Sequence, residues 1–154
     1  MREIETYIVD SFTDQPFKGN PAGVCVLQNE LSDSAMLSIA KELGLSETAF
    51  VAEMNENSEY PIRFFSPIME IPLCGHATLA SSKVLFQRNG RDSLAFVNIQ
   101  NVRLPVERHG EFIKMEFPVY ETIPKEAPFE LLRALGINEV NNSVYNAETR
   151  ILLL

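Results

Sequence analysis

The segment from His76 to Gln87 constrains the fold more than any other part of this sequence. Its pattern predicts a helix that ends at Asn89-Gly90. Apolar or small residues surround nearly its whole circumference, and a helix of that composition is normally buried on all sides. Strand-like segments lie before and after it. We therefore expect an α+β fold in which a curved, mostly antiparallel sheet is wrapped around a buried central helix.

The remaining pattern supplies the strands of such a sheet and a second helix. Ser32 is placed to cap a helix over residues 33–43, and Gly44 ends it. Segments rich in β-branched and aromatic residues predict the strands. These predicted strands are residues 4–9, 22–27, 48–52, 62–65, 94–99, 102–107 and 111–117.

The last part of the sequence has a different pattern. Residues 128–135 predict a short helix, residues 138–143 resemble a linker, and residues 144–154 return to strand character. The sequence closes on four aliphatic residues, whereas the ends of domains are usually polar unless they are tied down. We expect this strand to be buried against the rest of the chain, a missing segment or another copy.

Composition limits the classes of partner. The chain has 154 residues, with 13 basic and 21 acidic side chains and a net charge of -8. An acidic protein of this kind lacks the basic surface that nucleic acids and anionic membranes require. The first residues lack the order of a signal peptide, and two cysteines form no disulfide framework. We expect a soluble, cytoplasmic protein with neither a nucleic-acid nor a membrane partner.

The segment from Arg63 to Ala80 is the most informative one chemically. It predicts a strand, a turn and the first turn of the buried helix, where unpaired backbone N–H groups and the positive end of the helix dipole coincide. Gly75 would let a ligand approach the backbone. Such a helix start binds carboxylate or phosphate groups. The alternative is a helix start whose own residues satisfy its capping needs.

Glu47 is the second candidate because it opens an apolar strand. Burial raises the pKa of a carboxyl group, which then transfers protons near neutral pH. The alternative is a solvated glutamate, or one that accepts hydrogen bonds at a turn. Asn20, in the turn Gly19-Asn20-Pro21, has backbone groups that a site can use, although the tripeptide alone indicates only a turn.

Cys74 has two interpretations. At a helix N-terminus its thiolate would be stabilised, whereas a free cysteine is more often a small buried apolar residue. Cys74 and His76 are too few for a zinc site, and Cys25 and His109 add no ligand spacing. We therefore expect no metal.

Four segments, taken in order, resemble the PhzF-like (phenazine biosynthesis-like) family. The resemblance covers nearly the whole chain and matches the amino-terminal half of such proteins. It implies the diaminopimelate-epimerase fold, in which two similar domains enclose the active site. Residues 1–137 then correspond to the first domain, and residues 138–154 to a linker and strand that lead into or pack on a second, absent domain. The four segments are DSF at 10–12, FKGNP at 17–21, LSETAF at 45–50 and EIPLCGHAT at 70–78.

The resemblance also implies a chemistry, proton transfer without a metal or an organic cofactor on a small carboxylate-bearing metabolite. Glu47 matches the acidic proton shuttle of the family. The implied substrate-binding residues are Asn20, Gly75, His76, Ala77 and Thr78. Cys74 occupies the place of a catalytic cysteine in related amino-acid epimerases, but PhzF-like proteins do not all have it, so a structural role comes first.

One feature of the family is missing from this sequence. Family members are longer, and their second half carries an Asp-Pro-x-Thr-Gly-Ser segment that supplies a further acidic residue. Residues 78–154 contain nothing similar. Two functions therefore compete: an isomerase or epimerase-type enzyme, and a catalytically incomplete half-protein that binds a small anion or dimerises. We expect a homodimer, because the apolar strand at 144–154 would otherwise be exposed.

Overall fold

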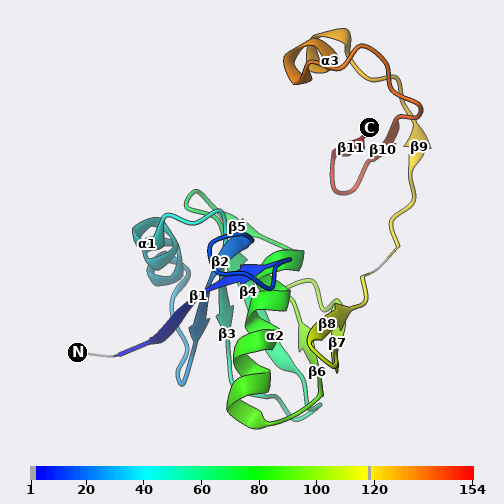
Figure 1. Ribbon diagram of the computed structural model, residues 1–154. Helices are drawn as coiled ribbons and strands as arrows, with labels where there is room; N and C mark the ends of the chain where they lie inside the picture. The colour runs from blue at the N-terminus through cyan, green and yellow to red at the C-terminus, as the bar shows by residue number, and fades with distance from the viewer. Residues whose placement is uncertain (1–2, 118) are drawn as a thin grey trace. The chain divides into compact units, whose positions relative to one another are not determined.

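The computed structural model describes residues 3–117 and 119–154. The chain forms two compact units, Met1–Glu116 and Phe117–Leu154, and each has its own sheet (Figure 1). The expected domain boundary at 137/138 lies inside the second unit and stays a prediction about the complete domain architecture. Among the described residues, no helix combines the length and apolar character needed to cross a bilayer.

The first unit is built on an eight-stranded sheet with the order β1-β2-β3-β4-β6-β7-β8, to which β5 adds by pairing with β4. Parallel pairing joins β2 to β3 and β4 to β6, and the other neighbours are antiparallel. The mostly antiparallel sheet expected from the sequence is therefore confirmed. Its strands are β1 (Glu5–Ser11), β2 (Asn20–Val26), β3 (Thr48–Val51), β4 (Tyr60–Phe65), β5 (Glu70–Ile71), β6 (Ser93–Val97), β7 (Arg103–His109) and β8 (Phe112–Met115).

The long helix α2 (Gly75–Asn89) lies inside this sheet. It packs against β1, β2 and β3 and also against β8, at the opposite edge of the sheet (Figure 1). One helix can contact both edges only because the sheet curls around it. The expected buried central helix is confirmed, since buried residues occupy most of its faces. They are Ala77, Thr78, Ala80, Ser81, Ser82, Val84, Leu85 and Phe86.

The shorter helix α1 (Asp33–Leu43) packs through Met36 and Ala40 on a second apolar cluster, which includes Phe50 and Phe65. Its bounds agree with those predicted from the sequence. The Ser32 hydroxyl accepts a hydrogen bond from the Ala35 N–H at 3.3 Å, as expected of an N-cap residue. A left-handed Gly44, with φ of 64°, ends the helix.

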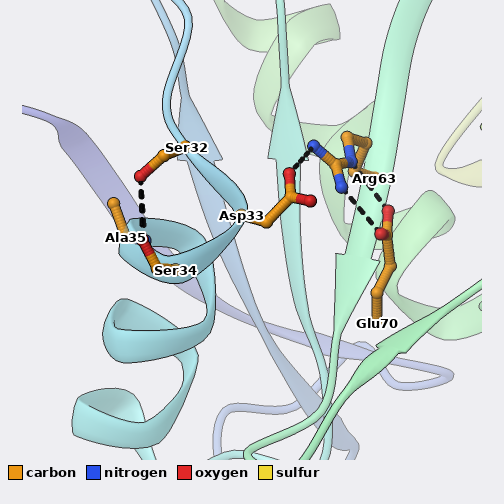
Figure 2. Close-up of polar contacts among 6 residues, drawn as sticks. All are labelled: Ser32, Asp33, Ser34, Ala35, Arg63 and Glu70. Atoms are coloured by element: carbon orange, nitrogen blue, oxygen red, sulfur yellow. Dashed lines mark hydrogen bonds and ion pairs between the residues drawn. The ribbon is translucent and has the colours of Figure 1, made fainter.

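Arg63 links the start of α1 to the sheet (Figure 2). Its Nε and Nη2 atoms each donate to the Glu70 carboxylate at 2.7 Å, and its Nη1 atom donates to Asp33 at 2.8 Å. The two-residue strand β5, which contains Glu70, leads through a short segment into α2. The arginine therefore joins β4, β5 and α1 on the path of the chain toward the buried helix.

The second unit contains a three-stranded antiparallel sheet with the order β11-β10-β9, and one helix. Its elements are β9 (Ile123–Pro124), α3 (Phe129–Leu135), β10 (Val144–Asn146) and β11 (Ile151–Leu153). The predicted helix at 128–135 is confirmed.

The strand character expected for residues 144–154 is found at both ends of this segment, which forms a hairpin of β10 and β11 and not one strand. Asn146 holds the turn by accepting hydrogen bonds from the N–H and hydroxyl of Thr149, and Arg150 adopts a φ of 57°. Ile151, Leu153 and Leu154 are exposed. The described residues therefore do not provide the burial expected for this segment.

Candidate active site

The candidate site lies where the chain enters β3 and where α2 begins. Glu47 immediately precedes β3, and its carbonyl accepts a hydrogen bond from the Gly23 N–H of β2 at 3.1 Å. His76 is in the first turn of α2. The two side chains meet, with His76 Nε2 3.3 Å from Glu47 Oε2. Glu47, the proton shuttle that the family resemblance implies, therefore lies beside this helix start, while the roles of the residues stay predictions.

The His76 imidazole is held through both of its nitrogens. Its Nδ1 atom lies 3.3 Å from the Cys74 sulfur, and the Ser46 hydroxyl lies 3.5 Å from its Nε2 atom. The His76 side chain is 10% exposed and that of Glu47 is 23% exposed. The carboxylate is thus partly shielded from water and still reachable by a ligand.

Buried hydroxyl groups fix the backbone around the histidine. Ser11, at the end of β1, donates to the His76 carbonyl at 2.7 Å. The Thr78 hydroxyl donates to the Cys74 carbonyl, also at 2.7 Å. The sequence analysis did not select Ser11 or Ser46 as site residues. Both were nevertheless within the segments that carry the family resemblance, and that was the signal that could have found them.

The predicted substrate-binding residues differ in their exposure to solvent. Asn20 is exposed at the start of β2 and is the register partner of Ser11, which places it one strand away from the His76 backbone. Ala77 and Thr78 are fully buried. Both residues therefore face the core and not the solvent, and the Thr78 hydroxyl is bonded to the Cys74 carbonyl.

The position of Gly19, just before Asn20, has no room for a side chain because the backbone of the β1–β2 loop passes close to it. A Cβ atom at this position would lie 2.3 Å from the Ser11 carbonyl oxygen and 2.6 Å from the Thr13 side chain. Any other residue would push the loop between β1 and β2 away from its present course. The glycine therefore helps to keep Ser11 and Asn20 at the edge of the site.

The backbone at the start of α2 is suited to bind an anion. The first intrahelical bond runs from the Thr78 N–H to the Cys74 carbonyl, so the N–H groups of Gly75, His76 and Ala77 have no intrahelical acceptor. Within the described part of the chain, Cys74 makes no side-chain capping bond and the first turn carries no acidic residue. The dipole of this 15-residue helix is therefore not offset by its own residues and favours a negative ligand group.

The Cys74 thiol is protonated at neutral pH. Burial raises its pKa from 9.0 to about 11, and the charge of Glu47 acts in the same direction, against the opposing effect of the Ala77 and His76 N–H groups. A nucleophilic thiolate at the helix start is therefore not supported. The alternative of a small buried residue agrees with an exposed fraction of 7%.

The fold also brings together a set of metal-ligand types that spacing did not reveal. One ligand atom each of Glu47, Cys74 and His76 lie within 4.8 Å of one another. The sequence spacing paired only Cys74 with His76, because Glu47 is far from both in the sequence and lies just before β3. Yet the two imidazole nitrogens face different partners, whereas a metal ion takes one nitrogen of a histidine. The arrangement is that of a hydrogen-bonded chain, and the expectation of no metal stays untested.

Two hollows lie away from this site, where the chain leaves β2 and β3. Their volumes are about 490 and 600 Å³, and both are lined by Leu27, Gln28, Asn29, Ala52 and Glu53. Neither is lined by Glu47 or His76.

Comparison with known proteins finds relatives that cover nearly the whole of this chain. A phenazine biosynthesis-like domain-containing protein 1 of Mus musculus is 39% identical, and the alignment covers 99% of this chain and 56% of that protein. An uncharacterized isomerase of Pseudomonas aeruginosa is 42% identical over 89% of this chain and 52% of its own length. The chain thus spans about half the length of the curated relatives it matches.

A solved structure shows the same fold. The crystal structure of a phenazine biosynthesis protein of the PhzF family from Enterococcus faecalis superposes with a TM-score of 0.80 at 38% identity, over 93% of this chain and 54% of that one. The profile of the family described as "Phenazine biosynthesis-like protein" matches residues 9–147, a range that includes Glu47, His76 and the strands that position them. The chain therefore belongs to the phenazine biosynthesis-like, or PhzC/PhzF, family.

Proposed function

We propose that this chain contributes the proton-transfer residue of an isomerase or epimerase-type active site that acts on a small carboxylate-bearing metabolite without a cofactor. The observation that carries the proposal is the 3.3 Å contact between Glu47 Oε2 and His76 Nε2 at the open start of α2. It joins a carboxylate that is partly shielded from water to a backbone that favours an anion.

The chemistry follows from that placement. A substrate carboxylate bound to the N–H groups of Gly75 and His76 would orient the reacting carbon toward Glu47. The same groups would stabilise negative charge that develops when a proton leaves carbon. A positioned carboxylate contributes about 10²- to 10⁴-fold through general acid–base catalysis. One carboxylate that removes a proton and returns it elsewhere suits an isomerase, whereas racemisation uses one group on each face.

The relatives support the class of reaction. The Pseudomonas aeruginosa relative is named an isomerase, and the family profile covers both Glu47 and the start of α2. The carboxylate substrate is inferred from the open helix start and not from any relative. The homodimer and the cytoplasmic location expected from the sequence also stay predictions.

A second candidate function is a module that binds a small anion, or dimerises, without turnover. It is favoured by the N–H groups at the start of α2 that have no intrahelical acceptor, which suit an anion whether or not a proton is transferred. In this case the N–H groups of α2 would still bind an anion, but Glu47 would have no proton to transfer.

Solvent deuterium exchange distinguishes the two functions. The chain is incubated in deuterium oxide with a panel of small cyclic amino acids, and deuterium incorporated at carbon is measured by mass spectrometry. The proposal predicts deuterium incorporation by the wild-type chain and none by Glu47→Gln. The control Glu42→Gln changes an exposed position on α1 and should incorporate as much as wild type. Saturable binding without incorporation would favour the module, and equal incorporation by wild type and Glu47→Gln would refute the role of Glu47.

A further inference from the structure

Cys74, His76 and Glu47 form a chain of polar contacts that the proposed proton transfer does not by itself explain. The imidazole lies between the other two side chains, with Nδ1 3.3 Å from the thiol sulfur and Nε2 3.3 Å from the carboxylate oxygen. Each ring nitrogen therefore has its own partner. The contacts to both nitrogens together decide which of them carries the hydrogen.

For a neutral imidazole that faces an ionised Glu47, the hydrogen inventory favours one arrangement, with the Ser46 hydroxyl, 3.5 Å from Nε2, as a longer alternative partner of that nitrogen. A carboxylate only accepts hydrogen bonds, so the nitrogen that faces it must be the donor, Nε2–H. In a neutral imidazole the other nitrogen then carries a lone pair and needs a donor. The Cys74 S–H group is positioned to be that donor. The opposite tautomer would direct the Nε2 lone pair at the lone pairs of the carboxylate.

The surroundings of Cys74 keep its thiol available for this contact. The side chain is 7% exposed, and burial keeps the proton on the sulfur at neutral pH. Cys74 is the N-cap residue of α2, yet within the described residues its side chain makes no capping bond. The Thr78 hydroxyl holds the Cys74 carbonyl at 2.7 Å, which fixes the backbone that carries the thiol.

We propose that Cys74 is a positioning residue whose thiol donates to His76 Nδ1 and thereby holds the tautomer that presents Nε2–H to Glu47. His76 then steadies one carboxylate oxygen of Glu47 and leaves the other oxygen for the substrate. The catalytic meaning of this arrangement rests on the function proposed above, but the tautomer itself does not. Cys74 takes no part in bond making and acts only through His76.

The tautomer is measured directly by nitrogen NMR of the chain labelled with ¹⁵N-histidine. The sequence has two histidines, and His109→Gln assigns the signals because His109 is on the exposed end of β7. At neutral pH the wild-type chain should show His76 as a single Nε2–H tautomer. Cys74→Ala should give a mixture of both tautomers, and Cys74→Ser, which keeps a donor of similar position, should restore the single form.

Three results would overturn the proposal: an Nδ1–H tautomer in wild type, a doubly protonated ring at neutral pH, or an unchanged single tautomer in Cys74→Ala. Deuterium exchange separates this inference from the proposed function. Where wild type exchanges, Cys74→Ala should lower kcat with little change in KM, and Cys74→Ser should recover most of it. If wild type shows no exchange but the tautomers behave as predicted, the proposed function fails and the positioning role of Cys74 stands.

Discussion

The two long helices of the first unit begin in opposite ways. At the start of α1, the Ser32 hydroxyl caps the Ala35 N–H, and Asp33 in the first turn is paired with Arg63 (Figure 2). At the start of α2, the described residues include no capping side chain and no acid in the first turn. The first turn of α1 is capped by its own sequence, whereas the first turn of α2 has backbone N–H groups without an intrahelical acceptor.

The carboxylates near these two helix starts differ in the same way. Asp33 is 78% exposed and paired with the Arg63 guanidinium group. Glu47 is 23% exposed and contacts the His76 imidazole. Asp33 thus takes part in a structural ion pair, whereas Glu47 lies where we propose proton transfer. The comparison therefore predicts different consequences for changes at the two helices.

The largest difference is expected when each carboxylate is replaced by its amide. Glu47→Gln should lower the rate of solvent deuterium exchange by about 10²- to 10⁴-fold, because it removes the acid–base group. Asp33→Asn should leave that rate unchanged within about two-fold, since it only weakens an exposed ion pair. Both rates come from the same mass-spectrometric assay. A similar loss in both variants would remove the distinction between the helices.

Arg63→Met should produce the largest loss of stability on the α1 side. It removes the two-pronged contact with Glu70 and the contact with Asp33, and we expect the free energy of unfolding to fall by about 2 kcal/mol. Arg103→Met is the matched control, because Arg103 pairs with Glu59 and is 62% exposed. That change should cost less than about 1 kcal/mol in urea unfolding. Equal losses of unfolding free energy in the two variants would show that the contacts of Arg63 stabilise the fold no more than an exposed ion pair does.

Alkaline pH should act on the α2 side through Cys74. Its thiol has a pKa of about 11 in the folded chain and 9.0 when unperturbed, so the unfolded chain loses this proton first. The stability that the thiol contributes is complete below pH 9 and is lost as the pH rises toward 11. Cys74→Ala should make this decline shallower by on the order of 2 kcal/mol, measured by urea unfolding at a series of pH values.

Cys25 serves as an internal reference for that experiment. Burial raises the pKa of its thiol too, and it remains in both chains, so its contribution cancels in the difference. An identical decline in wild type and Cys74→Ala would contradict the burial of a protonated thiol at the start of α2.

The smallest effect is expected at the cap of α1. Ser32→Ala removes the hydrogen bond to the Ala35 N–H and should lower the free energy of unfolding by about 1 kcal/mol. Ser38→Ala, on the exposed side of the same helix, should be neutral or slightly stabilising because alanine is the better helix former. Thermal unfolding of both variants checks this prediction. A neutral Ser32→Ala would show that α1 does not depend on its cap.

Local patterns in the sequence were sufficient to predict the helices. Ser32 and Gly44 mark the ends of α1, and the apolar circumference of the segment after His76 indicates a helix enclosed by a sheet. The strands β5 and β9 were not predicted. Each has two residues and is defined by the partner with which it pairs, so neither leaves a local pattern.

The turn of the C-terminal hairpin was not predictable for a similar reason. Its left-handed residue is Arg150, and no glycine marks the position. At the site, the meeting of Glu47 and His76 was expected only through the family resemblance, because the two residues come from separate elements. The contacts of Ser11 and Ser46 with His76 depend on how β1 and the chain before β3 approach α2, which no local pattern specifies.

The most direct test of the open start of α2 is an amide titration by NMR with a small cyclic amino acid as the ligand. We predict saturable shifts of the Gly75 and His76 N–H signals, while the N–H signals in the first turn of α1 stay in place. Shifts confined to α1, or no shift at α2 at concentrations that saturate binding elsewhere, would contradict the claim that this helix start receives the substrate carboxylate beside Glu47.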